Sequence, residues 1–185
     1  MGDPKAVQTG LMHDDVADMT AEGSQQVLTF VLGDETYGVD ILRVQEIRGW
    51  SAVTKIPHVP PHVLGVLNLR GCIVPVVDLR TRFALEKAEY TSLTVIVVLS
   101  VQSGKSRRDF GVVVDGVSDV VDVDPAAVKP APDLGSRAAT DHIRGLVPVS
   151  GRMVMLLDID CLIGGEFAAK DEDGTAAVVV ASCAA

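Results

Sequence analysis

Arg70 is the residue of this chain whose type and setting point most directly to a specific interaction. It stands next to Gly71, at a predicted turn between two aliphatic segments. A guanidinium in such a position is usually held by a carboxylate or presented to a partner, because its donors form a rigid fork. Glu46, within the predicted strand 41–48, is the candidate carboxylate, and a bidentate pair would lock the arginine in one geometry. The alternative is an exposed arginine without a fixed partner, and the residues alone favour neither.

Other polar residues offer catalytic chemistry only weakly. Asp115 and Asp119 flank a predicted turn, where two carboxylates could do acid–base work. Acids at such turns more often stabilise the local backbone and stay exposed. His142 follows Asp141 directly, and the sequence gives the histidine no evident serine or cysteine partner. We therefore expect no catalytic residues, although a hydrolase that uses Asp115 or His142 is kept as an alternative.

The sequence also lacks motifs that hold metals or phosphates. His58 and His62 are four residues apart, but the two prolines between them prevent the regular helix that would bring both imidazoles to one metal. The three cysteines show no short spacing typical of zinc sites. Residues 104–106, which read Gly-Lys-Ser, lack the upstream glycine of a phosphate-binding loop. We expect neither a metal nor a cofactor.

The formal net charge of −9 is concentrated at the two ends of the chain. Residues 1–24 carry five acids and one lysine, and residues 166–185 carry four acids and one lysine. A basic stripe is absent, so the sequence does not predict nucleic-acid binding. The longest mainly apolar run, residues 93–99, is too short to span a bilayer, and the N-terminus has no apolar signal region. We expect a cytoplasmic protein without membrane insertion.

The elements that position these residues are predicted to be short strands. Hydrophobic residues make up 48% of the chain and aromatic residues only 4%, so the core consists mainly of Val, Leu and Ile. Branched aliphatic residues in short runs, with turn signals every eight to twelve residues, are typical of an all-β barrel or sandwich. The expected strands are 26–32, 35–39, 41–48, 66–69, 72–79, 93–101, 110–114, 117–123, 145–149 and 153–157.

Several local features refine this prediction. Pro75 places the strand 72–79 at a sheet edge or a bulge. Asp115-Gly116 predicts a type I′ hairpin between its flanking strands. Residues 102–108 read as a polar loop, residues 62–65 as one helical turn, and residues 158–163 as a short helix.

The chain has two similar halves, with a change of composition near residues 84–92. We expect two small barrels, at about 34–90 and 91–163, with the strand 26–32 possibly shared between them. Each barrel alone would be marginal, and packing them together would bury a third apolar layer. A flexible segment, 1–24, precedes the barrels, and an acidic then apolar tail, 166–185, follows them.

Several separated motifs resemble the CheW family of chemotaxis coupling proteins. They are residues 32–35, 37–49, 65–80 with the core Asn68-Leu69-Arg70-Gly71, 111–120, and 130–132. The resemblance covers about residues 25–165 and leaves both tails outside.

The resemblance implies an all-β fold of two SH3-like five-stranded barrels packed together, with no enzymatic activity. It implies an adaptor that couples methyl-accepting chemoreceptors to the histidine kinase CheA, in arrays at the inner membrane. A groove between the barrels would take the cytoplasmic tip of the receptor, and exposed barrel edges would meet the regulatory domain of CheA. The matching receptor-binding positions are Val44, Gly65, Arg70, Val95, Gly111 and Val117, with Glu46 as the partner of Arg70. The alternative is an adaptor of a pathway that controls pili or biofilm.

Overall fold

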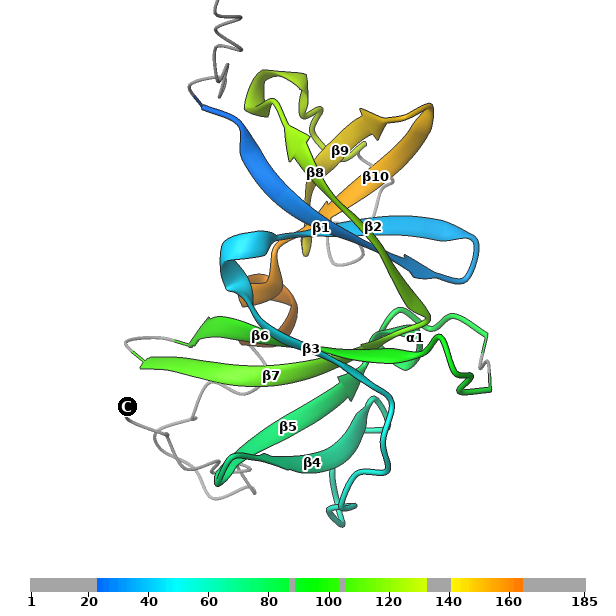
Figure 1. The fold of residues 1–185 in the computed structure, drawn as a ribbon, viewed down its shortest axis with the longest axis vertical. Helices are drawn as coiled ribbons and strands as arrows, with labels where there is room; N and C mark the ends of the chain where they lie inside the picture. The colour runs from blue at the N-terminus through cyan, green and yellow to red at the C-terminus, as the bar shows by residue number, and fades with distance from the viewer. Residues whose placement is uncertain (1–22, 87–88, 104–105, 133–140, 165–185) are drawn as a thin grey trace, which may run out of the picture.

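Ten strands form two five-stranded sheets in the structure, a computed structural model that describes residues 23–86, 89–103, 106–132 and 141–164 (Figure 1). The first sheet has the order β8 (Gly116–Val123), β1 (Gln25–Leu32), β2 (Glu35–Asp40), β10 (Arg152–Leu157), β9 (Ile143–Val149). The second has the order β3 (Val44–Gly49), β6 (Val95–Ser103), β7 (Ser106–Val114), β5 (Cys72–Asp78), β4 (Val63–Leu69). The short helices are η1 (Ile41–Arg43), α1 (Leu79–Arg82), η2 (Pro125–Ala127) and η3 (Asp160–Gly164). The predicted all-β class is confirmed.

The two barrels are not the two successive segments predicted from the sequence. The first barrel combines β1 and β2 with β8, β9 and β10, and the second barrel consists of β3 to β7. The division at 34–90 and 91–163 is therefore wrong. Strand β3, from the first half of the chain, pairs with β6 from the second half, and β8, from the second half, pairs with β1 from the first. The strand 26–32 is not shared, since both of its partners lie in the first sheet.

The two similar halves of the sequence nevertheless appear as a structural repeat. Strands β1 to β5 and β6 to β10 occupy matching places in the two sheet orders. Each barrel closes with a parallel pair: Leu156 of β10 lies opposite Gly38, and Val76 of β5 lies opposite Gly111. Each half therefore gives two strands to one barrel and three to the other, so the halves are interleaved.

Several local predictions also change. Asp115-Gly116 is a crossover between sheets and not a hairpin, because β7 and β8 belong to different barrels. β5 is not an edge strand; its pairs with β7 begin at Val76, so Pro75 is not required to donate to that ladder. The predicted polar loop is shorter, because β6 and β7 extend to Ser103 and from Ser106. β4 begins at Val63, where one helical turn was expected, whereas the hairpin of β9 and β10 is confirmed.

The largest hydrophobic cluster lies between the two barrels and takes residues from both. Phe30 and Val39 of the first barrel meet Leu99 and Phe110 of the second, and all four are at most 1% exposed. A smaller cluster fills each barrel, with Val154 in the first and Ile96 in the second. Full burial of each large aliphatic or aromatic side chain contributes about 1.5–3 kcal/mol. The shared cluster therefore joins the barrels into one body.

The predicted N-terminal segment, apart from residues 23–24, and the predicted C-terminal tail lie outside the described residues. Within the described part of the chain, no helix has the length and apolar character needed to cross a membrane.

Candidate partner-binding surface

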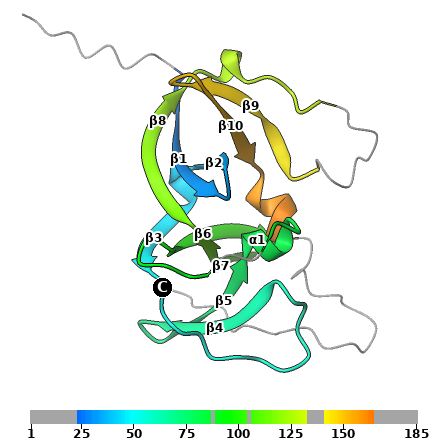
Figure 2. The ribbon, with the colours of Figure 1, turned by 90° about the vertical axis from the view of Figure 1, so that its right-hand side faces the viewer.

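The two crossover strands, β3 and β8, lie on one side of the molecule, and α1 and η3 lie on the opposite side (Figure 2). Each crossover strand is one of the two edge strands of its sheet. Val44 begins β3 and lies opposite Leu99, whereas Val117 near the start of β8 lies opposite Phe30. The crossover side, called here the β3–β8 face, therefore takes one edge from each barrel.

Three of the predicted receptor-binding residues lie at this face, beside the hydrophobic cluster between the barrels. Val44, Val95 and Val117 are all half-buried and pack against the cluster between the barrels. Val95 lies opposite Gly49, so it stands at the far end of β3 from Val44. The structure thus places these three valines along one apolar boundary between the barrels.

Two exposed leucines near this boundary were missed by the sequence analysis. Leu42 of η1 is 80% exposed and stands two residues before Val44. Leu93 is 74% exposed, and its carbonyl oxygen lies 3.7 Å from the position that a Cβ of Gly116 would occupy. Large apolar side chains with this exposure are typical of interaction sites when they cluster. The sequence signal was weak, because each leucine falls within a segment that was assigned to a strand as a whole.

Gly65 and Gly111 have packing roles within the second barrel. Gly65 has φ +145°, and a Cβ there would lie 2.1 Å from the carbonyl oxygen of Thr54. The backbones of Thr54 and Val66 exchange two hydrogen bonds of 2.9 Å at this point, so the close approach is fixed. At Gly111, a Cβ would lie 2.9 Å from Cγ2 of Ile96. The packing of the barrel is therefore sufficient to require glycine at both positions.

Arg70 lies in the turn between β4 and β5, with φ +52°. Its Nη2 is 3.7 Å from Oε2 of Glu46, and its side chain is 90% exposed. That distance is too long for a hydrogen bond, so the bidentate lock considered from the sequence is not formed. Gly71 N donates to Oδ1 of Asn68 at 2.8 Å, which stabilises the turn and presents the guanidinium to solvent.

The catalytic alternatives find little support in the geometry. The carboxylate of Asp115 accepts hydrogen bonds from Arg80 and from the backbone N–H of Gly33, so it is engaged in structural contacts. The backbone of Asp119 exchanges two hydrogen bonds with Oγ1 of Thr29. Among the described residues, no group of three or more potential metal ligands gathers in one place.

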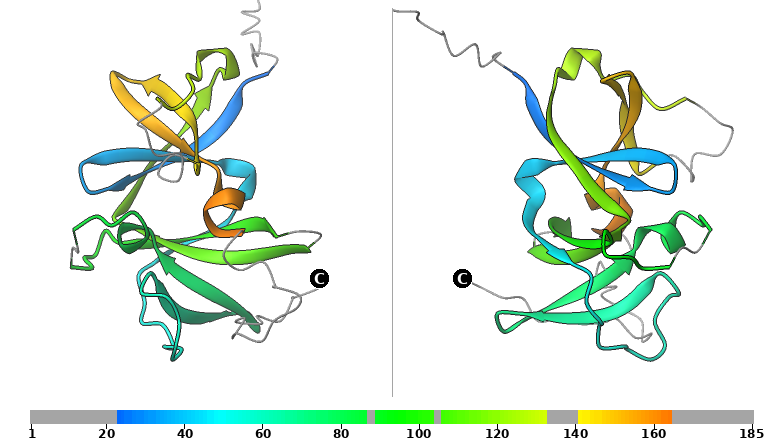
Figure 3. Two further views of the ribbon diagram at one scale, coloured as in Figure 1. Left: turned by 180° about the vertical axis from the view of Figure 1, so that it is seen from behind. Right: turned by 45° about the vertical axis from the view of Figure 1, so that its right-hand side comes forward.

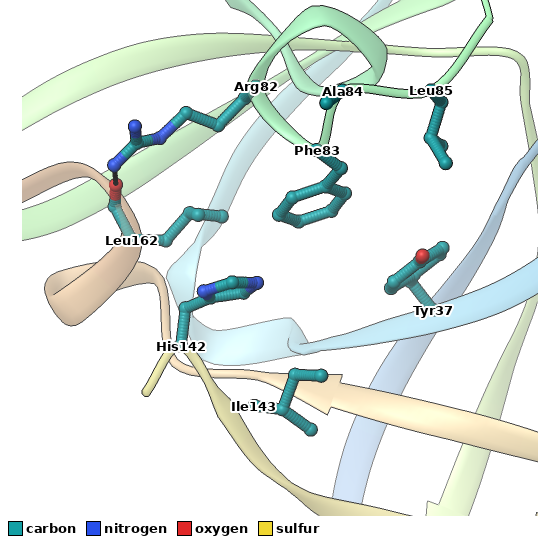
Figure 4. A pocket seen from close by; sticks show the side chains of 8 residues that line it. All are labelled: Tyr37, Arg82, Phe83, Ala84, Leu85, His142, Ile143 and Leu162. Atoms are coloured by element: carbon teal, nitrogen blue, oxygen red, sulfur yellow. Dashed lines mark hydrogen bonds between the residues drawn. The ribbon is translucent and has the colours of Figure 1, made fainter. Parts of the chain in front are cut away.

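A cavity of about 380 Å³ opens on the side of α1 and η3. Figure 4 shows its lining residues, which are Tyr37, Arg82, Phe83, Ala84, Leu85, His142, Ile143 and Leu162.

The aromatic residues of this cavity join the two barrels. Phe83, which follows α1, has its ring centroid 5.5 Å from that of Tyr37 and 5.0 Å from that of His142. Tyr37 in turn stacks on Phe30 at 6.1 Å. Burial and the positive charge of Arg82 lower the pKa of His142. The imidazole therefore favours its neutral form, in which it stacks on Phe83 between the barrels.

The fold places the chain among all-β proteins built from two five-stranded barrels. Comparison with known proteins then gives the family: residues 26–166 match the family model described as a CheW-like domain. The chain therefore belongs to the CheW-like family of chemotaxis scaffold proteins.

Known relatives agree with this assignment. The chain is 45% identical to the chemotaxis protein CheW of Klebsiella aerogenes, over 77% of this chain and 83% of the relative. It is 39% identical to CheW of Rhizobium meliloti, over 78% of this chain and 90% of the relative. The crystal structure of the scaffolding protein TtCheW from Thermoanaerobacter tengcongensis has a TM-score of 0.68 and 29% identity, over 76% of this chain and 95% of that one. The resemblance, and the two SH3-like barrels that it implies, are confirmed, and the chain is a chemotaxis adaptor of the CheW type.

Proposed function

We propose that this adaptor couples the cytoplasmic tip of methyl-accepting chemoreceptors to the histidine kinase CheA, and that the β3–β8 face receives the receptor tip. The observation that carries the proposal is the apolar boundary of Val44, Val95 and Val117, to which both barrels contribute. An amphipathic helix can lay its apolar face along such a boundary. The exposed side chains of Leu42 and Leu93 extend the apolar area available to it.

Arg70 and the two glycines have different parts in this proposal. Arg70 offers a solvent-exposed guanidinium, with Glu46 close enough to bias its orientation. It would supply a polar contact to the receptor tip, as rim charges do in many interfaces. Gly65 and Gly111 contribute to receptor binding indirectly, because they keep the second barrel closely packed beneath the surface.

The regulatory domain of CheA binds elsewhere, at an exposed strand edge of one barrel. Strand edges present unpaired backbone groups that a similar barrel can satisfy. Separate surfaces on one rigid body allow both partners to bind at once, so receptor state can bias kinase state. Weak individual contacts gain strength when many copies assemble at a receptor array at the inner membrane. The chain acts by contact, without catalysis.

The direct test is a binding experiment with purified receptor-tip fragment and the regulatory domain of CheA, followed by a kinase assay in receptor-containing membranes. We expect the chain to bind each partner and to raise kinase activity only when receptors are present. Kinase activity that is independent of this chain would contradict the proposal. Reproducible ATP hydrolysis by the purified chain would contradict the assignment as a non-enzymatic adaptor.

A further inference from the structure

The chain passes from one barrel to the other twice: through η1, between β2 and β3, and at the junction of β7 and β8. An arginine–aspartate pair stabilises each of these crossovers. In the first crossover, Nη2 of Arg43 lies 2.7 Å from Oδ2 of Asp160, and Nη1 donates to the carbonyl of Ser100 at 3.3 Å. Oδ1 of Asp160 also accepts the backbone N–H of Gln102 at 2.7 Å. Figure 3 shows η1, which carries Arg43, and η3, which carries Asp160, both at the level between the two barrels. This set of contacts is called the first joint.

The second crossover has a matching joint with its own hydrogen bonds. Nε of Arg80 donates to Oδ1 of Asp115 at 2.5 Å, and Nη2 donates to Oδ2, which makes the pair bidentate. Oδ2 of Asp115 also accepts the backbone N–H of Gly33 at 2.7 Å, and the backbone N–H of Asp115 donates to Val31 O at 3.1 Å. The hydrogen bond that Arg80 donates to Asp115 raises the pKa of Arg80, so the arginine stays charged. This second joint ties α1, the β1–β2 turn and the β7–β8 crossover together.

The positive and negative members of the pair exchange places between the two joints. The first crossover contributes the arginine, and the helix after β10 contributes the aspartate; the second crossover contributes the aspartate, and the helix after β5 contributes the arginine. If two copies of the first half, β1 to β5, were combined in the same way, Arg43 of one copy would face Arg80 of the other. Two copies of the second half, β6 to β10, would likewise bring Asp115 toward Asp160. Like charges at such a contact are unfavourable, so the joints favour the interleaved arrangement of the two halves.

Each joint has a residue just upstream of a valine of the β3–β8 face. Arg43 directly precedes Val44, and Asp115 is two residues before Val117. The arginine and aspartate side chains of both joints are only 18–31% exposed, so solvent screens these pairs less than it screens the Arg70–Glu46 contact. The joints are thus placed to fix where β3 and β8 begin.

We propose that Arg43, Asp160, Arg80 and Asp115 are positioning residues, which hold the barrels at one angle and thereby set the spacing of Val44 and Val117 for a helical partner. The part concerning a helical partner rests on the proposed function, whereas the angle between barrels does not. The partner contacts the valines, and the four charged residues act through the backbone that carries them.

The experiment tests whether the barrels keep one angle in the full chain without a partner, by measuring a distance between them. Ile73 and Met153 are second residues of the matching strands β5 and β10, one in each barrel, and are 42% and 48% exposed. Spin labels attached through ketone-bearing residues at these two positions report the distance between barrels by pulsed electron paramagnetic resonance. We expect a narrow distance distribution in the parent chain, and a distribution at least twice as wide after Asp115→Asn or Arg80→Ala.

The matched control is Asp109→Asn, which removes an exposed carboxylate from β7, outside the β3–β8 face, and should leave the distribution unchanged. The double variant Arg80→Ala/Asp115→Asn should be no worse than either single variant, because the pair acts as a unit. In unlabelled chains, the affinity for a receptor-tip fragment should fall about tenfold for each single variant and should not change for Asp109→Asn. Circular dichroism identifies any variant that fails to fold, and the Arg43→Ala and Asp160→Asn variants then repeat the test at the first joint.

Unchanged distance distributions in folded joint variants would overturn the inference, even if their melting temperatures fall. Altered distributions with unchanged receptor affinity would also overturn it, because the spacing would not matter for binding. A parent chain that does not bind the receptor tip would contradict the proposed function instead, and the distance distributions would still decide whether the joints fix the barrels.

Discussion

The guanidinium of Arg70 lies 3.7 Å from the carboxylate of Glu46, yet the arginine side chain is 90% exposed. An ion pair this open to solvent typically contributes about 0–1 kcal/mol to stability. The turn that carries Arg70 is instead stabilised by Asn68, which accepts the backbone N–H of Gly71. The arrangement therefore suits a residue that is presented to a partner better than one that stabilises the fold.

Replacement of Arg70 by alanine should separate binding from folding. We expect Arg70→Ala to change the free energy of unfolding by less than about 1 kcal/mol and to weaken receptor-tip binding about tenfold. Arg152→Ala is the matched control, since Arg152 is an exposed arginine beside the equivalent hairpin of the first barrel. Denaturant unfolding and titration with the receptor fragment measure the two effects. Equal receptor affinity for Arg70→Ala and Arg152→Ala would remove Arg70 from the site.

Replacement of Gly65 by alanine should act through stability. A Cβ at this position meets the backbone of Thr54 at 2.1 Å, and φ of +145° is strained for any other residue. We expect Gly65→Ala to lower the free energy of unfolding by about 2–4 kcal/mol. Gly49→Ala is the control, because no atom lies within 4 Å of its Cβ position. A normally stable Gly65→Ala variant that has lost receptor binding would show that Gly65 is a contact residue.

The ring stack on the other side of the molecule predicts a further change in stability. Phe83 lies between Tyr37 and His142, and its removal leaves both rings of the first barrel without their partner from the second. We expect Phe83→Ala to destabilise the protein by about 2 kcal/mol, whereas Phe83→Leu should lose less, because it keeps most of the apolar contact. Thermal unfolding of both variants measures the difference. Equal stability of the parent chain and Phe83→Ala would mean that the stack does not hold the barrels together.

The same stack predicts a dependence of stability on pH. Burial and Arg82 lower the pKa of His142 below its ordinary value of 6.5, while Asp141 acts in the opposite direction. The unfolded chain therefore binds the proton more readily, so this contribution is fully present above pH 6.5 and is lost as the pH falls toward the lowered pKa. We expect the His142→Phe variant to lose less stability than the parent chain between pH 7 and pH 5, measured by denaturant unfolding. Parallel pH profiles for the two proteins would argue against this role of His142.

The strands of this protein could be predicted from the sequence, because alternation and turn residues are local signals. Which strands pair with one another could not be predicted. Two similar halves can each form a barrel alone or exchange strands with each other, and the local sequence pattern is the same in both cases. Asp115-Gly116 shows the difficulty: the dipeptide is typical of a hairpin, but here it is a crossover held by Arg80.

The candidate surface was only partly predictable for a related reason. The family resemblance supplied Val44, Val95 and Val117, which the structure brings to one cluster. The side-chain exposure of Leu42 and Leu93 depends on where η1 ends and β6 begins, and the sequence does not fix these boundaries. The ring stack joins residues that are far apart in the chain, so only the tertiary structure reveals it.

The most direct test of the central claim is sedimentation of the chain with a receptor-tip fragment and the regulatory domain of CheA, each carrying a different chromophore. The account predicts one species that contains all three components, because the two partners occupy different surfaces of one rigid body. Two binary species that exclude each other would contradict it.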